Sequence, residues 1–118
     1  MSAEIVWVNH AGYLIRDKEI GILVDPWLSG TSFNKGWSLL SDTKLSDDDM
    51  ETVTHIWYSH EHPDHFSVPD LKRLKDSCKN LKAVLFQKTL DRRVAEFCEK
   101  MSIQIIELGH LHEFSLSK

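Results

Sequence analysis

The sequence has few cysteines and no long apolar run. Its two cysteines, Cys78 and Cys98, are too few and too far apart for a disulfide scaffold. Both fall on the apolar faces of expected helices, so we expect buried free thiols rather than metal ligands. No apolar stretch is long enough for a transmembrane span, and the N-terminus lacks the basic-then-apolar pattern of a signal peptide. These absences favour a cytoplasmic protein with no membrane partner.

An excess of positive charge is also absent. The chain carries 14 Lys and Arg against 18 Asp and Glu, a net charge of -4. This balance argues against a nucleic-acid-binding surface, although nucleotides remain acceptable as substrates. A length of 118 residues, 42% of them hydrophobic, fits a single globular domain or a part of one. We therefore expect one domain over 1–118 and a small-molecule substrate.

The first part of the chain alternates short apolar runs with tight polar turns. The runs lie at 4–8, 13–16 and 20–24. Closely spaced strands with such turns predict an antiparallel meander. Asp25 and Pro26 follow the third run, and Pro26 ends it because proline cannot donate to a strand ladder.

A long polar stretch from 29 to about 46 comes next. Long connections inside a domain are often functional. The aromatic residues Phe33 and Trp37 either fix this loop to the domain, the commoner role, or line a pocket. At its end, Ser46 precedes three aspartates, which predicts a capped helical turn with acids at its N-terminus. That cap explains the acidic run better than a metal site does.

The remaining chain predicts strands that alternate with helices. Strands are expected at 55–58, 82–86 and 103–108. Apolar residues at helical spacing mark two helices between them, with buried faces formed by Val68, Leu71, Leu74 and Cys78 and by Leu90, Val94, Phe97, Cys98 and Met101. Two successive strand–helix–strand units imply parallel strands. The closing segment 109–118 begins as a turn and becomes an alternating strand pattern, and a pattern that stops there is typical of a truncated domain.

The segment 59–65, Ser-His-Glu-His-Pro-Asp-His, carries most of the chemistry. His60 and His62 point the same way in an extended segment and can close on one ion. Asp64 and His65 suit a second ion or a water beside the first. Histidine tracts also occur without function, but this one lies between a strand and a helix, where α/β sheets bind ligands. The motif and its context together favour a metal site.

The spacing His60-x-His62-x-Asp64-His65 after a strand resembles the hallmark of the metallo-β-lactamase fold superfamily. The opening meander that ends in Asp25 resembles the same family's layout. The sequence of residues 25–30 is similar to that of the branch that contains CMP-N-acetylneuraminate hydroxylase-like and related bacterial hydrolase-like proteins. The resemblance implies an α/β fold that forms the N-terminal half of an αββα sandwich, an antiparallel meander followed by β-α-β-α-β.

The resemblance also implies a role for each residue of the motif. His60 and His62 would bind a first metal, and Asp64 and His65 a second. Asp64 would hold the attacking water and manage its proton, as the catalytic residue. Asp25 would orient the cluster through hydrogen bonds. The loop from Trp27 through Phe33 to Trp37 would shape the substrate cleft.

A histidine at the third motif position, where the family's diiron flavoprotein-type oxidoreductases usually carry Glu, favours zinc, as one or two ions, with iron and manganese left open. The implied activity is a metal-dependent hydrolase in which metal-bound hydroxide attacks an ester, amide, lactone or phosphodiester. One alternative is an iron-dependent oxidoreductase like the hydroxylase-like proteins. Another is a catalytically incomplete half domain that acts as an interaction module.

The family's later metal ligands would lie downstream of this chain. His110 and His112 have the required type, but exposed turn histidines are the commoner explanation, and we expect His10 and His55 to be structural. A lone half would expose the apolar face of its sheet. We therefore expect a homodimer, or association through that face.

Overall fold

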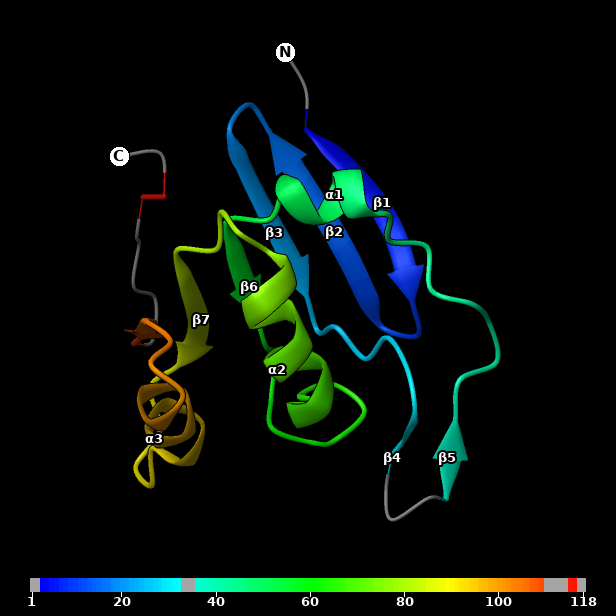
Figure 1. Cartoon of the computed structure of the whole chain (residues 1–118). Coiled ribbons are helices and arrows are strands. Elements are labelled where there is room, and N and C mark those ends of the chain that lie inside the picture. The colour runs from blue at the N-terminus through cyan, green and yellow to red at the C-terminus, as the bar shows by residue number, and fades with distance from the viewer. Residues whose placement is uncertain (1–2, 33–35, 110–114, 117–118) are drawn as a thin grey trace.

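A computed structural model describes residues 3–32, 36–109 and 115–116. Within these ranges a six-stranded sheet has the order β1-β2-β3-β6-β7-β8 (Figure 1). The strands are β1 (Glu4–Asn9), β2 (Gly12–Asp17), β3 (Ile20–Val24), β6 (His55–Trp57), β7 (Ala83–Gln87) and β8 (Ile105–Leu108). The strand expected within 109–118 falls largely outside the described residues.

The pairing confirms the predicted change from a meander to parallel strands. β1 pairs with β2 and β2 with β3 in antiparallel fashion. β3 pairs with β6, β6 with β7, and β7 with β8 in parallel. Val24 and Trp57, the last residues of β3 and β6, are direct partners. The segments that leave these two strands therefore start side by side at the carboxyl edge of the sheet.

In the part of the chain that the structure describes, three helices cover one face of this sheet: α1 (Asp47–Glu51), α2 (Val68–Ser77) and α3 (Arg93–Lys100) (Figure 1). Alternating strand residues such as Leu23 and Ile56 meet the helical stripes in a single buried core. Its members are Val8, Leu14, Leu23, Val53, Ile56, Tyr58, Leu71, Leu74, Cys78, Val84, Phe86, Val94, Cys98 and Ile103. None of the helices in the described ranges has the length and apolar character needed to cross a bilayer.

Serine caps mark the starts of α1 and α2, and the cap expected at Ser46 is confirmed. The Ser46 side chain accepts from the Asp49 N–H while the Asp49 side chain accepts from the Ser46 N–H, a reciprocal cap on α1. Ser67 caps α2 by accepting from the Asp70 N–H. These two caps fix where the chain turns from each preceding loop into a helix.

Leu90 was expected on the buried stripe of the second helix, and this prediction is wrong. α3 begins only at Arg93, after Arg92 adopts a left-handed conformation with φ of 52°. Leu90 therefore lies in the connection before the helix, where its side chain is fully exposed. Helical spacing alone could not reveal that the helix starts three residues later.

The expected irregular loop contains a small hairpin. Its strands are β4 (Thr31–Ser32) and β5 (Trp37–Ser38), paired in antiparallel fashion. Phe33 lies between them, outside the described residues. The Asn9 side chain donates to the Ser41 carbonyl at 2.9 Å and to Thr43 Oγ1 at 3.2 Å. The segment that follows the hairpin is therefore held against the end of β1.

Gly21 allows β6 to lie beside β3. A Cβ at this position would come within 2.1 Å of the Thr52 carbonyl oxygen, which is closer than atoms can approach. The Thr54 N–H donates to the Gly21 carbonyl at 2.8 Å, and the Gly21 N–H donates to Thr54 Oγ1 at 3.1 Å. This close contact aligns β6 with β3 and so positions the loop that follows β6.

Candidate metal centre

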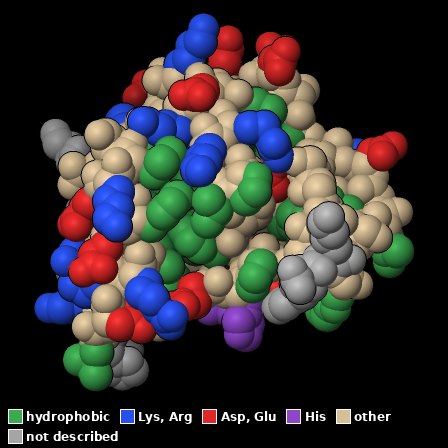
Figure 2. Space-filling view, turned by 60° about the horizontal axis from the view of Figure 1, so that its bottom comes forward, with side chains coloured by type: hydrophobic (Ala, Val, Ile, Leu, Met, Phe, Trp, Pro, Cys, Tyr) green, Lys and Arg blue, Asp and Glu red, His purple; other side chains and the backbone are tan. Residues whose placement is uncertain are grey.

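The residues of the histidine motif lie on the connection between β6 and α2, at the carboxyl end of β6. Asp25 comes from the adjacent β3 end, and His10 from the turn between β1 and β2. Histidine side chains reach the surface at the lower edge of the molecule in Figure 2, next to apolar side chains. Three segments that are distant in sequence thus meet at one solvent-accessible place.

The Asp25 carboxylate anchors this site, because it is the shared hydrogen-bond acceptor for Ser59 and His65. Its carboxylate is buried and accepts from the Ser59 N–H at 2.7 Å, the Ser59 hydroxyl at 2.6 Å and His65 Nδ1 at 2.9 Å. Several donors around one carboxylate offset the cost of burying its charge. Asp25 also has a φ of 44°, a left-handed conformation that turns the chain sharply out of β3.

These hydrogen bonds determine which nitrogen of each imidazole carries a proton. An ionised carboxylate only accepts, so His65 Nδ1 carries a proton, and in the neutral imidazole its Nε2 has a free lone pair. The Ser59 hydroxyl proton is directed to Asp25, so His60 Nδ1 donates to Ser59 Oγ at 2.8 Å. Its Nε2 then also has a free lone pair. Both imidazoles are therefore in the tautomer that binds metals through Nε2.

Asp64 lies with its Oδ2 3.3 Å from His65 Nε2 and 2.9 Å from His10 Nε2. The Asp64 residue is only 6% exposed. At this distance an ionised oxygen and an imidazole nitrogen attract each other only through a proton on that nitrogen or through a cation between them. Imidazole and carboxylate together suit zinc, iron and manganese. The residues present therefore fit the metal that the motif predicts.

The four predicted ligands lie together. The ring centroids of His60 and His62 are 4.7 Å apart, and those of His60 and His65 are 4.1 Å apart. His62 turns the chain back, because its carbonyl accepts from the N–H groups of both His65 and Phe66. This turn brings the second pair of motif residues beside the first.

His10 and His55, both expected to be structural, have different surroundings. His55 is 4% exposed, its Nδ1 lies 2.8 Å from Thr54 Oγ1, and burial and the charge of Lys82 lower its pKa. His10 instead contacts Asp64 across 54 positions of sequence. The ligand atoms of His10, Asp64 and His65 all lie within 4.8 Å of one another. No local sequence pattern links residue 10 to residue 64, so only the sheet reveals this contact.

A hollow of about 510 Å³ borders His10 and is lined by three tryptophans, Trp7, Trp27 and Trp37. Trp27 is 1% exposed and lies edge-on to the His10 ring, with centroids 5.0 Å apart. Trp37 is 50% exposed, with its ring centroid 6.3 Å from that of His10. Of the expected cleft residues, Trp27 is therefore part of the buried support, while Trp37 forms an open wall beside the cluster.

The two cysteines belong to the hydrophobic core and not to the candidate metal centre. Cys78 and Cys98 are buried free thiols in the core between the helices and the sheet. Burial raises the pKa of each thiol to about 11. The expectation of buried free thiols is confirmed. The raised pKa disfavours the thiolate, which is the form that binds metals and reacts.

A sheet that ends in oriented histidines and aspartates, supported by a buried carboxylate, defines a metal-binding α/β domain. The chain belongs to the beta-lactamase superfamily domain family, whose profile matches residues 4–114. The motif-based resemblance to the metallo-β-lactamase fold superfamily is thereby confirmed.

Relatives and solved structures of this fold carry different activities. A cytidine monophosphate-N-acetylneuraminic acid hydroxylase of Danio rerio is 29% identical over 106 residues, which cover 89% of this chain and 18% of that protein. CmlA, a diiron beta-hydroxylase from Streptomyces venezuelae, has a TM-score of 0.72 at 20% identity over 97% of this chain and 22% of its own. Igni18, a metallo hydrolase from Ignicoccus hospitalis, has a TM-score of 0.55 at 17% identity over 92% of this chain and 41% of its own. The chain thus spans about a fifth of the length of the two hydroxylases.

Proposed function

We propose that this chain carries the metal-binding part of an enzyme active site that acts on a small molecule. The observation that supports this most directly is the contact between His65 Nε2 and Asp64 Oδ2 at 3.3 Å. In a neutral His65 the hydrogen bond to Asp25 keeps the proton on Nδ1, so Nε2 and Asp64 Oδ2 then both present electron pairs to the same point. A divalent cation would turn this repulsion into two bonds.

His60 and His62 would hold a first ion, and Asp64 and His65 a second. A bound zinc ion lowers the pKa of a coordinated water and polarises the substrate oxygen. Asp64, at the same place, would take the proton of the attacking water and return it to the leaving group. Asp25 would keep both imidazoles in their metal-binding tautomers throughout. The substrate would enter past Trp37, whose side chain borders the hollow beside His10.

The first candidate reaction is hydrolysis of an ester, amide, lactone or phosphodiester. Water supplies the hydroxyl group that adds to the acyl or phosphoryl centre, and the leaving group takes the proton. His62, at the position where flavoprotein-type oxidoreductases of the family usually carry Glu, supports zinc and hydrolysis. The similarity in fold to the metallo hydrolase Igni18 fits the same candidate.

The second candidate is an iron-dependent hydroxylase. The Danio rerio relative is a hydroxylase that matches 89% of this chain. CmlA, a diiron hydroxylase, shares the fold over 97% of it. Imidazole and carboxylate ligands serve iron as readily as zinc. Metal identity therefore separates the two candidates better than the shape of the site does.

The test is metal content per chain, measured by plasma mass spectrometry on protein purified without chelator. The double variant His60→Ala/His62→Ala is compared with Lys72→Ala/Lys75→Ala, which removes two exposed side chains of α2 instead. Zinc in the parent and control, lowered in the histidine variant, together with turnover in an ester, lactone and phosphodiester screen, supports the hydrolase. Iron with oxygen-dependent turnover supports the hydroxylase. A parent that binds no metal when zinc, iron and manganese are supplied would contradict both and favour an interaction module.

A further inference from the structure

The backbone of the turn between β1 and β2 holds His10 in one orientation. The His10 N–H donates to Asn9 Oδ1 at 2.9 Å, and its carbonyl accepts from Trp7 Nε1 at 2.9 Å. Its φ of 50° is left-handed, a conformation that histidine adopts more readily than most residues. The side chain therefore leaves the hairpin in a direction that its neighbours determine.

That direction leads to the motif loop. His10 Nε2 lies 2.9 Å from Asp64 Oδ2, and the His10 and His65 rings have centroids 5.8 Å apart. Trp27 supports the His10 ring from the side, edge-on at 5.0 Å. The His10 side chain is 30% exposed, against 8% for that of Asp64. An imidazole that is partly open to solvent thus faces the buried carboxylate.

The spacing of the three ligand atoms fits a coordination shell. Metal–nitrogen and metal–oxygen bonds of 2.0–2.2 Å place neighbouring ligand atoms roughly 2.9–3.5 Å apart in octahedral or tetrahedral geometry. The observed separations from Asp64 Oδ2 are 2.9 Å to His10 and 3.3 Å to His65. All three ligand atoms lie within 4.8 Å of one another. They can therefore surround one ion after small side-chain movements.

We propose that His10 is a metal ligand, and that His10, Asp64 and His65 form a complete three-ligand site for a divalent first-row cation. The inference rests on the proposed function and adds a ligand from the first hairpin to the motif residues. Two imidazoles and one carboxylate leave coordination positions open, as in catalytic zinc sites and in non-haem iron(II) sites. With three protein ligands, the described part of the chain can hold one ion without a ligand from elsewhere.

The competing explanation is that His10 only donates a hydrogen bond to Asp64 and so positions it. The two roles differ in the state of Nε2, because a ligating nitrogen carries no proton and a donating one does. Substitution by glutamine preserves an N–H donor of similar reach but supplies a poor metal ligand. These two differences define the experiment.

The full chain, labelled with ¹⁵N-histidine, is titrated with Zn²⁺ and followed by long-range ¹H–¹⁵N spectra and by competition with a chromophoric chelator. The ¹⁵N signal of His10 Nε2 is expected to move to the chemical shift of a metal-bound nitrogen. His10→Gln should weaken binding of one Zn²⁺ equivalent by at least about 10-fold, because the loss of a direct ligand should cost no less than the 10-fold that the loss of an outer-shell partner already costs. His10→Asn, which tolerates the left-handed backbone, should do the same, and circular dichroism verifies that both variants fold. His62→Gln should leave the Zn²⁺-bound signal of His10 in place.

A protonated His10 Nε2 in the Zn²⁺-loaded protein would overturn the inference, as would parent-like affinity in His10→Gln. If Zn²⁺ binding is lost in His60→Ala/His62→Ala but unchanged in His10→Gln, the proposed metal centre stands and the role of His10 is wrong. If the parent binds no Zn²⁺, the proposed metal centre falls together with the inference.

Discussion

The backbone N–H and the hydroxyl of Ser59 both donate to the buried carboxylate of Asp25, at 2.7 and 2.6 Å. Asp25 follows β3 directly, and Ser59 lies two positions beyond the end of β6. The two strands are parallel partners, with Val24 opposite Trp57. The sheet register therefore decides that these residues meet, and their contact orients the imidazoles of the motif.

Replacing Asp25 by Asn should weaken metal binding strongly. The amide offers one acceptor oxygen instead of two and brings a donor against Ser59 or His65, so the tautomers of the histidines are no longer enforced. Losing an outer-shell partner of this kind typically costs about 10–100-fold in metal affinity. Asn tolerates the left-handed conformation at this position. Chelator competition measures the affinity, and circular dichroism verifies the fold.

Ser59→Ala is the matched comparison for Asp25→Asn. It removes the hydroxyl between Asp25 and His60 but retains the Ser59 backbone N–H bond and the bond from His65. We expect a smaller loss of affinity than in Asp25→Asn, with a mixture of His60 tautomers in ¹⁵N spectra. An equal or larger loss in Ser59→Ala would contradict the role of Asp25 as the common anchor.

Asp70→Ala should destabilise the protein by about 3 kcal/mol, in line with the loss of one partner from a buried charged network. Asp70 is 1% exposed and accepts from the N–H groups of Leu28 and Ser29 at 2.7 and 3.3 Å. It also accepts from the Ser29 and Ser67 hydroxyls and from Arg73. It thereby ties the segment after β3 to the start of α2.

Urea unfolding measures this loss, and Asp76→Ala, an exposed acid on the same helix, is the control. The control should change stability by less than about 0.5 kcal/mol. Similar unfolding midpoints for the two variants would show that the Asp70 network does not hold the loop.

His55 should make stability depend on pH in the weakly acidic range. Burial, with a smaller effect from Lys82, lowers its pKa in the folded protein below 6.5. The unfolded chain then binds the proton first, so the contribution of neutral His55 is complete above about pH 6.5 and declines as pH falls through the folded pKa. His55→Gln should flatten the curve of unfolding free energy between about pH 7 and pH 5. An unchanged slope would exclude this residue as the cause.

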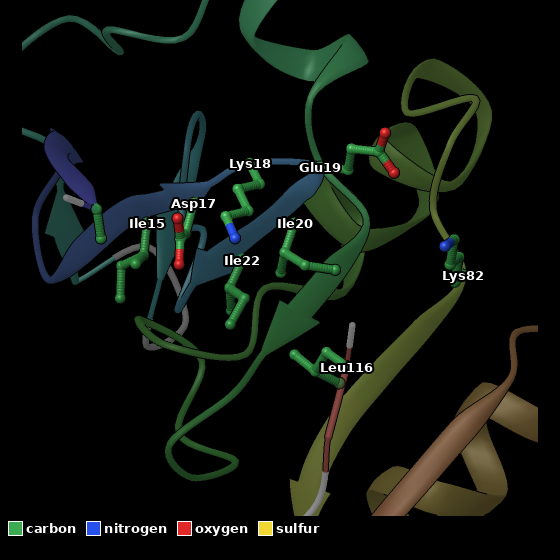
Figure 3. A pocket seen from close by; sticks show the side chains of 9 residues that line it. Ile15, Asp17, Lys18, Glu19, Ile20, Ile22, Lys82 and Leu116 are labelled. Carbon is green, nitrogen blue, oxygen red and sulfur yellow. The ribbon is translucent and has the colours of Figure 1, made fainter. Parts of the chain in front are cut away.

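The face of the sheet opposite the helices should make the chain associate. Ile5 is 69% exposed, and Trp7 and Tyr13 are each 41% exposed. On the same face, a hollow of about 760 Å³ is lined by apolar residues together with charged ones, Asp17, Lys18, Glu19 and Lys82 (Figure 3). Its apolar lining residues are Ala3, Ile15, Ile20, Ile22 and Leu116. Apolar surface of this kind drives association in water.

Sedimentation velocity at micromolar concentration should therefore show a dimer or larger species for the parent chain. Ile5→Lys should shift the distribution toward monomer, because a charge on this face opposes its burial. Leu90→Lys is the control, since Leu90 is an exposed apolar residue of the β7–α3 connection. A parent that sediments as a monomer would contradict the expected association.

Much of this protein was predictable from local patterns. Period-two and helical spacing located the strands and helices, because each pattern reflects which side chains can face a common core. The cap at Ser46 marked one helix start. The error at Leu90 has a local cause, since a left-handed Arg92 begins α3 later than the apolar spacing indicates. The spacing of His60, His62, Asp64 and His65 indicated a metal site because those ligands are neighbours along the chain.

The contacts that complete the candidate site were not predictable in this way. His10 meets Asp64 across 54 positions, and Ser59 meets Asp25 across 34. Such pairs depend on which strands become neighbours and in what register, a result of packing the whole sheet against its helices. The sequence by itself therefore determined the elements and the local set of metal ligands. Only the tertiary structure decided which distant residues orient that set, because hydrogen bonds act over about 3 Å in space regardless of separation along the chain.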